Sequence, residues 1–242
     1  MRHYLLALLS ISVLLCSNAV AQSNKKPVKG YNIAITIDNS KDSMLYLGSY
    51  YLGDTYAIDS AARDKKDTYT FANKEKYLMP GLYFFTNKKG NFVEFVNFRE
   101  EMKKVQFHTK AADWEKYITV KGSQQNAEFI DYKTESAKLS AHGRTPNRGE
   151  ADSLKEAFIR NHPDNMLAMM MNATRPIIVP VVNEKGDTLS QRERNLYYVT
   201  HYWDNVPLNE DFLTRTPKSI FVQTFRDFVD KVLRGGTPAD LI

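Results

Sequence analysis

The hydrophobic repeat of this chain changes within one stretch, VKGSQQNAEF (Val120–Phe129). Before it, apolar side chains recur at every second residue, which is the repeat of half-buried β-strands. After it, they recur every three or four residues, which is the repeat of amphipathic helices. Gly122 closes the strand pattern, and Ser123 is a good N-cap for the helix that follows. The stretch therefore divides a β part from an α part.

The part before Gly122 is expected to consist of short β-strands. Apolar side chains at every second position of 31–37 alternate with shorter or polar ones, as in a strand with one face buried. Turn signals such as Gly53-Asp54 and Pro80-Gly81 break the chain roughly every ten residues. The strands are predicted at 31–37, 44–51, 55–59, 69–71, 82–86, 92–98, 105–108 and 117–120. Strands of this length and spacing are typical of an antiparallel β-sandwich.

The part after Gly122 is expected to form five helices. They are predicted at 123–139, 150–160, 163–171, 190–204 and 217–234, with a basic break at 142–149 and an extended stretch at 177–182. Pro163 is expected in the first turn of the third helix, and Thr216-Pro217 is expected as N-cap and first turn of the fifth. Gly235-Gly236 is expected to end that helix. A core stripe is predicted on it, made of Phe221, Phe225, Phe228 and Val232.

These patterns predict an α+β fold of two segregated domains. An antiparallel β-sandwich is expected over residues 30–122, and an α-helical domain over residues 123–242, with a hinge near Gly122. Residues 22–29 are expected to be a linker. Residues 22–242 are long enough for two ordinary domains.

The first residues have the features of an export signal. A positive start, Met1-Arg2-His3, precedes an apolar run from Tyr4 to Cys16, and Ala19-Val20-Ala21 is a small-x-small cleavage site before Gln22. We expect cleavage between Ala21 and Gln22, so that residues 1–21 are removed and the protein works in the periplasm or cell envelope. The alternative is a lipoprotein acylated at Cys16, for which Leu15 is a poor match.

Composition excludes some functions. Cys16 is the only cysteine, so a chain that loses the signal has no thiol and cannot carry out thiol–disulfide exchange. The net charge of +5 comes from scattered lysines rather than from a basic stripe, so no nucleic-acid partner is expected. No second apolar run is long enough to predict a transmembrane helix.

Two groups of residues are candidates for a ligand or interface site. His201, Trp203, Asp204 and Asn205 could line a pocket for a small polar ligand. The alternative is structural, with Trp203 packed under a helix and the next residues forming its exit turn. Tyr50 and Tyr51, in a tyrosine-dense part of the strands, could form a face for a glycan or a protein. The alternative there is half-exposed tyrosines, which are common on strands.

No catalytic residue, metal site or cofactor is predicted. Soft thioethers of Met166 and Met169–Met171 could suggest Cu(I), but consecutive methionines on a helix point about 100° apart and cannot share one ion. Flexible core filling is the favoured interpretation. The five histidines have no spacing typical of a zinc site, and no phosphate loop or nucleophile elbow is found.

Several segments resemble one family. The order of a signal, a β part beginning Gly-Tyr-x-Ile (Gly30–Ile33) and VKGSQQNAEF resembles the front half of thioredoxin-like envelope proteins of Bacteroidetes-type bacteria. NHPDNMLAMMMNA (Asn161–Ala173) and HYWDNVPLNEDFLTRTP (His201–Pro217) resemble the helical domain of unknown function that lies between that β part and the thioredoxin domain. The resemblance covers roughly residues 30–242.

The chain departs from that family in one respect. In the relatives, a C-terminal thioredoxin domain with a Cys-x-x-Cys motif carries out the redox reaction. This sequence lacks that motif. The resemblance therefore implies that the helical domain is incomplete at its C-terminus, Thr237–Ile242. No catalytic residue can be carried over.

Three functions remain open. The first is a non-catalytic exported module that docks another envelope protein or a thioredoxin-like domain, or that fixes a homodimer. The second is the N-terminal part of a periplasmic thiol-disulfide oxidoreductase. The third is a hydrolytic or carbohydrate-active envelope protein with a site between its two parts.

Overall fold

The structure is a computed structural model that describes residues 29–140 and 147–234. The export signal with Cys16, the cleavage site at Ala21 and Gln22, most of the expected linker, and Gly235-Gly236 lie outside the described residues. So does most of the basic break predicted at 142–149.

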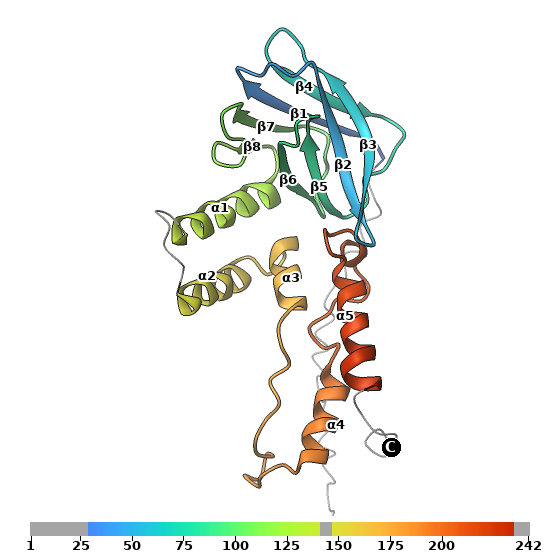
Figure 1. Cartoon of the computed structure of the whole chain (residues 1–242), viewed down its shortest axis with the longest axis vertical. Coiled ribbons are helices and arrows are strands. Elements are labelled where there is room, and N and C mark those ends of the chain that lie inside the picture. Colours follow the sequence, from blue (N-terminus) through green and yellow to red (C-terminus); the bar gives the residue numbers. More distant parts are fainter. Residues whose placement is uncertain (1–28, 141–146, 235–242) are drawn as a thin grey trace, which may run out of the picture.

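Eight strands form two four-stranded sheets (Figure 1). They are β1 (Tyr31–Asp38), β2 (Met44–Tyr51), β3 (Asp54–Ala62), β4 (Thr68–Asn73), β5 (Gly81–Thr86), β6 (Phe92–Asn97), β7 (Val105–Lys110) and β8 (Thr119–Lys121). The first sheet has the order β4-β1-β7-β8, and the second has the order β3-β2-β5-β6. The period-2 pattern therefore located every strand, with ends shifted by a few residues.

One strand pair corrects the prediction of a purely antiparallel arrangement. β1 and β7 run parallel, from Ile33 opposite Val105 to Asp38 opposite Lys110, so the first sheet is mixed. The other pairs between named strands are antiparallel. The alternation of apolar side chains is the same for both directions, so it could not show that β7 returns from the second sheet to lie beside β1.

Apolar side chains from both sheets share one core. Phe71 on β4 stacks on Phe85 of β5 with ring centroids 5.4 Å apart, and Phe107 on β7 lies 5.1 Å from Phe95 on β6. In β1, every second side chain from Tyr31 to Ile37 is buried, as the alternation indicates. Burial of this apolar surface is the main force that holds the two sheets together.

The α part contains five α-helices and two short segments. They are α1 (Gln124–Leu139), α2 (Arg148–Asn161), α3 (Met166–Ala173), α4 (Gln191–His201), the 3-10 helix η2 (Asp211–Thr214), α5 (Ile220–Phe228) and the π-helical turn η3 (Val229–Leu233). α1 contacts β6 and β8, and α2 contacts α1 and α3. Figure 1 shows a long stretched connection between α3 and α4, and α4 at the end of the molecule away from the sheets.

Helix starts confirm one prediction and correct two. Ser123 is the N-cap of α1, and its side chain accepts from the N–H of Asn126. Pro163 does not lie in α3, because Asn165 caps that helix by accepting from the N–H of Leu167 at 2.8 Å. Thr216 is not the N-cap of α5. That residue is Ser219, with a φ of 44°, whereas the Thr216 hydroxyl accepts from Ile220 N–H one turn earlier.

A second core joins the helices to the opposite face of the second sheet. Phe98, just after β6, packs edge-on against Phe212 of η2 at 5.6 Å. The backbone N–H groups of Leu52 and Leu82 donate to the carbonyls of Thr214 and Arg215. The core also contains Val96, Phe129, Met166, Ala173, Val206 and Leu213, with Met169 and Met170 packed against it. Met166, Met169 and Met170 of α3 therefore contribute to this core.

The core stripe predicted on Phe221, Phe225, Phe228 and Val232 is wrong for its first two residues. Phe221 is 37% exposed and Phe225 is 51% exposed, and their rings stack on each other at 6.1 Å. Phe228 is half-buried against Tyr202 and Trp203, and only Val232 is buried. The periodicity identified an apolar face correctly, but no described element covers its first half.

Candidate functional site

The segment predicted as a site begins at the end of α4. His201 is the last residue of that helix, and its Nδ1 lies 2.6 Å from Oδ2 of Asp204 in the following turn. The ring of Tyr197 lies one helical turn earlier, 4.1 Å from the imidazole. The carboxylate and the tyrosine ring together fix the orientation of the imidazole.

A groove runs along this end of α4. It has a volume of about 680 Å³ and lies between α2, the extended segment (residues 175–182) and α4. Its lining is formed by Arg148, Asp152, Lys155, Glu156, Arg175, Pro176, Ile177, Ile178, Tyr197, His201, Asp204 and Asn205. We call this the α2–α4 groove. Three of the four predicted residues therefore line one surface.

Trp203 is the exception. Its ring packs against Tyr202 at 5.3 Å and Phe228 at 5.5 Å, and it lies against the second core. Trp203 does not line the groove. Its position agrees with the structural interpretation, in which Trp203 packs under a helix.

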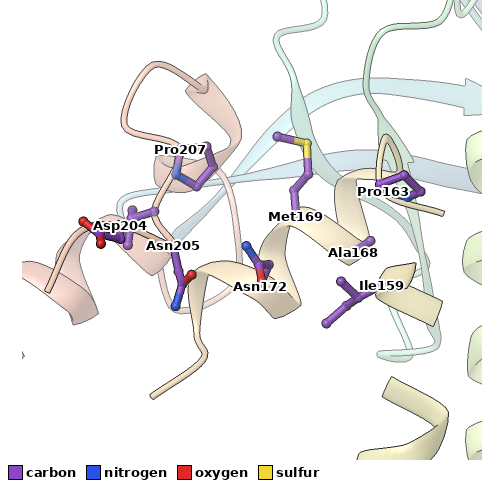
Figure 2. A pocket seen from close by; sticks show the side chains of 9 residues that line it. Ile159, Pro163, Ala168, Met169, Asn172, Asp204, Asn205 and Pro207 are labelled. Atoms are coloured by element: carbon purple, nitrogen blue, oxygen red, sulfur yellow. The ribbon is translucent and has the colours of Figure 1, made fainter. Parts of the chain in front are cut away.

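A smaller hollow adjoins the groove at Asp204 and Asn205 (Figure 2). It has a volume of about 320 Å³. Figure 2 shows Asn172 of α3 and Asn205 as polar side chains near its middle, with Met169 and Ala168 among its apolar walls. The turn after α4 thus separates a charged groove from a mainly apolar hollow.

Most charges in the α2–α4 groove are paired with each other. Arg175 forms an ion pair with Glu156, and Arg148 lies 3.8 Å from Asp152. Asp204 is held by His201. Among the described residues, Lys155 has no carboxylate within ion-pairing distance. The groove therefore offers one half-buried ammonium group to a ligand.

The extended segment forms an apolar wall. Ile178 is 85% exposed and Val181 is 62% exposed. The segment ends in a tight turn, where Val182 and Thr188 form an isolated bridge and Asn183 N–H donates to the carbonyl of Asp187. The sequence predicted that 177–182 is extended, but exposure of its β-branched side chains depends on neighbours and was not predicted.

The two candidate tyrosines lie elsewhere. The Tyr50 hydroxyl donates to Glu94 Oε1 at 2.9 Å, and burial, followed by the nearby Glu94 carboxylate, raises the pKa of Tyr50. Tyr51 is 40% exposed, with the Arg215 guanidinium 4.9 Å from its ring centre. Neither residue lines the groove or the hollow. Tyr50 is a half-buried strand residue, and Tyr51 is part of a separate exposed patch with Tyr56.

Sequence reasoning missed the contribution of α2. Asp152, Lys155 and Glu156 of that helix, together with Arg175, form the charged side of the groove. The signal was present as charges spaced three or four residues apart on one helical face. Only the structure shows that this face of α2 borders the α2–α4 groove.

Within residues 29–140 and 147–234, no three His, Cys, Asp or Glu side chains gather in a way that could hold a metal ion. In the same ranges no helix combines the length and the apolar character that crossing a bilayer requires.

The chain thus combines a β part of two sheets with a helical part that packs on it and carries the groove. Residues 31–129 match the family model of a domain of unknown function, DUF4369. The matched range covers the eight strands and continues into α1 as far as Phe129. Comparison with curated proteins and comparison with solved structures each gave no match.

Proposed function

We propose that this chain is a non-catalytic docking module of the bacterial cell envelope. In this proposal a β-sandwich supports a helical unit, and the α2–α4 groove holds a segment of another protein. The observation that supports it most is the apolar wall of the groove, because side chains such as Ile178 are exposed beside charges that pair with one another. Exposed apolar surface with a polar rim is typical of interaction sites.

The proposed location and partner rest on the sequence. The export signal at residues 1–21 supports a periplasmic location, with a lipid anchor at Cys16 as the alternative. The resemblance of 161–173 and 201–217 to the region before thioredoxin domains favours a thioredoxin-like domain or another envelope protein as partner. The oxidoreductase alternative places the redox motif outside this chain, since residues 22–242 contain no cysteine.

The His201–Asp204 pair is the observation that favours a hydrolytic alternative. An imidazole oriented by a carboxylate can act as a general base. The residues that line the groove include no serine, threonine or cysteine, so the nucleophile would be water or a carboxylate of the lining. Conversion of His201 to Ala would abolish a hydrolytic activity that depends on this general base, and unchanged turnover would contradict the alternative.

Site-specific cross-linking in the native host tests the docking function. A photoactivatable residue at Ile178 is expected to give a discrete cross-linked product with a protein that mass spectrometry identifies. The matched control is Lys65, which is exposed on the turn between β3 and β4, away from the groove. Products of equal yield from both positions, or none from Ile178, would contradict a docking role for the groove.

A further inference from the structure

Three consecutive residues of the extended segment have unpaired backbone groups. Within residues 29–140 and 147–234, no hydrogen bond is made by the backbone N–H or C=O of Ile177, Ile178 or Val179. Backbone donors and acceptors in folded proteins are normally paired with protein or with water. These groups are therefore available to a partner that can replace water.

Alternation along residues 176–180 shows which backbone groups share an edge. The chain bends at Val181, where the tight turn begins. Backbone groups of alternate residues in an extended chain point to the same edge. Val179 precedes Pro180 and is therefore restricted to extended conformations. Ile177 and Val179 thus share one edge of the segment, whereas Ile178 faces the other edge together with Pro176 and Pro180.

Only one of the two edges can accept a strand over several residues. The edge of Ile178 also carries Pro180, which has no N–H and interrupts any hydrogen-bond ladder. The edge of Ile177 and Val179 keeps both donors and both acceptors. Proline at this position blocks one side and leaves the other open.

The open edge belongs to a segment that borders the α2–α4 groove. Figure 1 shows α4 on the far side of the turn from the extended segment. Ile177 and Ile178 line the groove on one side, and Tyr197 and His201 of α4 line it on the other. Its volume of about 680 Å³ is within the usual range for ligand sites.

We propose that the groove binds an extended peptide segment of a partner protein, which adds as a β-strand to the edge formed by Ile177 and Val179. A carboxylate of that peptide pairs with Lys155, the groove cation that has no partner among the described residues. The inference rests on the proposed docking function and specifies the ligand. Main-chain hydrogen bonds supply affinity in this mode of binding, and contacts of alternate side chains supply specificity.

The proposed occupant is a single extended peptide, so the test uses a peptide as the probe.

The probe is a library of random peptides, about seven residues long, displayed on phage and selected on the exported full chain. Selected peptides are expected to have apolar residues at alternate positions and one Asp or Glu. One selected peptide is then synthesised, and its dissociation constant is measured for the native chain and for two proline variants.

The matched variants differ only in the edge that they affect. Val179→Pro removes an N–H from the open edge, and Ile178→Pro removes one from the blocked edge. Val179→Pro is expected to weaken binding about tenfold or more, and Ile178→Pro by less than about threefold. In the native chain, peptide binding should also slow amide exchange at Ile177 and Val179 but not at Ile178. This second measurement requires no variant to fold.

The carboxylate is tested by a double-mutant cycle. Lys155→Gln should weaken the acidic peptide about tenfold and leave unchanged a peptide whose acid is replaced by its amide. Equal effects of the two proline variants with unchanged amide exchange would overturn strand addition, and so would a selection that enriches no peptide. Because cross-linking at Ile178 does not depend on these readouts, it would show separately whether the docking function fails as well.

Discussion

The side-chain amide of Asn126 on α1 pairs with the backbone of Val96 on β6 as a neighbouring strand would. Val96 N–H donates to Asn126 Oδ1 at 2.7 Å, and Asn126 Nδ2 donates to the Val96 carbonyl at 2.8 Å. β6 is the last strand of the second sheet, and Asn126 is fully buried. One side chain therefore satisfies an edge of the sheet and attaches the first helix to it.

Asn126→Ala should destabilise the protein by about 2–4 kcal/mol, because it leaves a buried N–H and a buried carbonyl unpaired. The measurement is the free energy of unfolding from urea titration. Asn195→Ala, at an exposed position on α4, is the control and should change the free energy by less than about 0.5 kcal/mol. Similar effects of both substitutions would show that the pairing contributes little.

Gly122→Ala should destabilise the junction between β8 and α1. Gly122 has a φ of +83°, and an added Cβ would lie 2.5 Å from the Lys104 carbonyl oxygen. Gly90→Ala is a matched control, since its φ is +86° but nothing lies within 4 Å of the added atom. We expect about 1 kcal/mol for Gly90→Ala and about 3 kcal/mol for Gly122→Ala. Thermal unfolding of both variants measures the difference, and equal losses would exclude the clash.

Trp203→Ala should cost about 3 kcal/mol, as expected for an aromatic ring packed against a core. Phe225→Ala should cost less than about 1 kcal/mol, because that ring is 51% exposed. Comparison of the two urea midpoints tests the arrangement of α5 relative to the turn after α4. A larger loss for Phe225→Ala would mean that another element covers this face of α5 in solution.

Asp42 should make stability depend on pH in the acid range. The hydrogen bond from Lys89 holds the pKa of Asp42 below its usual value of 3.8, and a hydrogen bond from Asn87 also favours the charged form, while burial opposes both. A carboxyl with a lowered pKa in the folded state stabilises the protein above its unfolded pKa, and this stabilisation is lost as pH falls through the folded value.

The test compares the native chain with Asp42→Asn at pH 7 and near pH 3. The native chain should be the more stable of the two at pH 7, and the difference should shrink in acid. Lys89→Gln removes the largest cause of the lowered pKa and should reduce the dependence on pH. A difference that stays constant between the two pH values would contradict this assignment.

Strand and helix positions could be predicted from the sequence because both depend on local periodicity. The alternation at Tyr31–Ile37 and the cap at Ser123 are properties of a few neighbouring residues. Strand direction is not local, so the parallel pairing of β1 with β7 could not be seen. Burial is not local either, and Phe225 has the spacing of a core residue but is 51% exposed and stacks on Phe221 of the same helix.

The candidate site also combines local features, which the sequence predicts, with non-local features, which it does not. His201, Asp204 and Asn205 could be selected as a polar group near a helix end, and the structure places them on one groove. Lys155 and Arg175 enter that groove only because α2 and the extended segment fold back toward α4. No pattern within either segment predicts that return.

The unpaired stretch at Ile177–Val179 also determines where the chain can be cut. Exposed segments without backbone hydrogen bonds are preferred sites of proteolytic nicking. The piece that follows such a nick would remain attached, because Phe212 is buried in the second core and Thr214 and Arg215 accept hydrogen bonds from Leu52 and Leu82. A protease would therefore yield a two-chain protein that stays assembled, and an occupied groove would delay its formation.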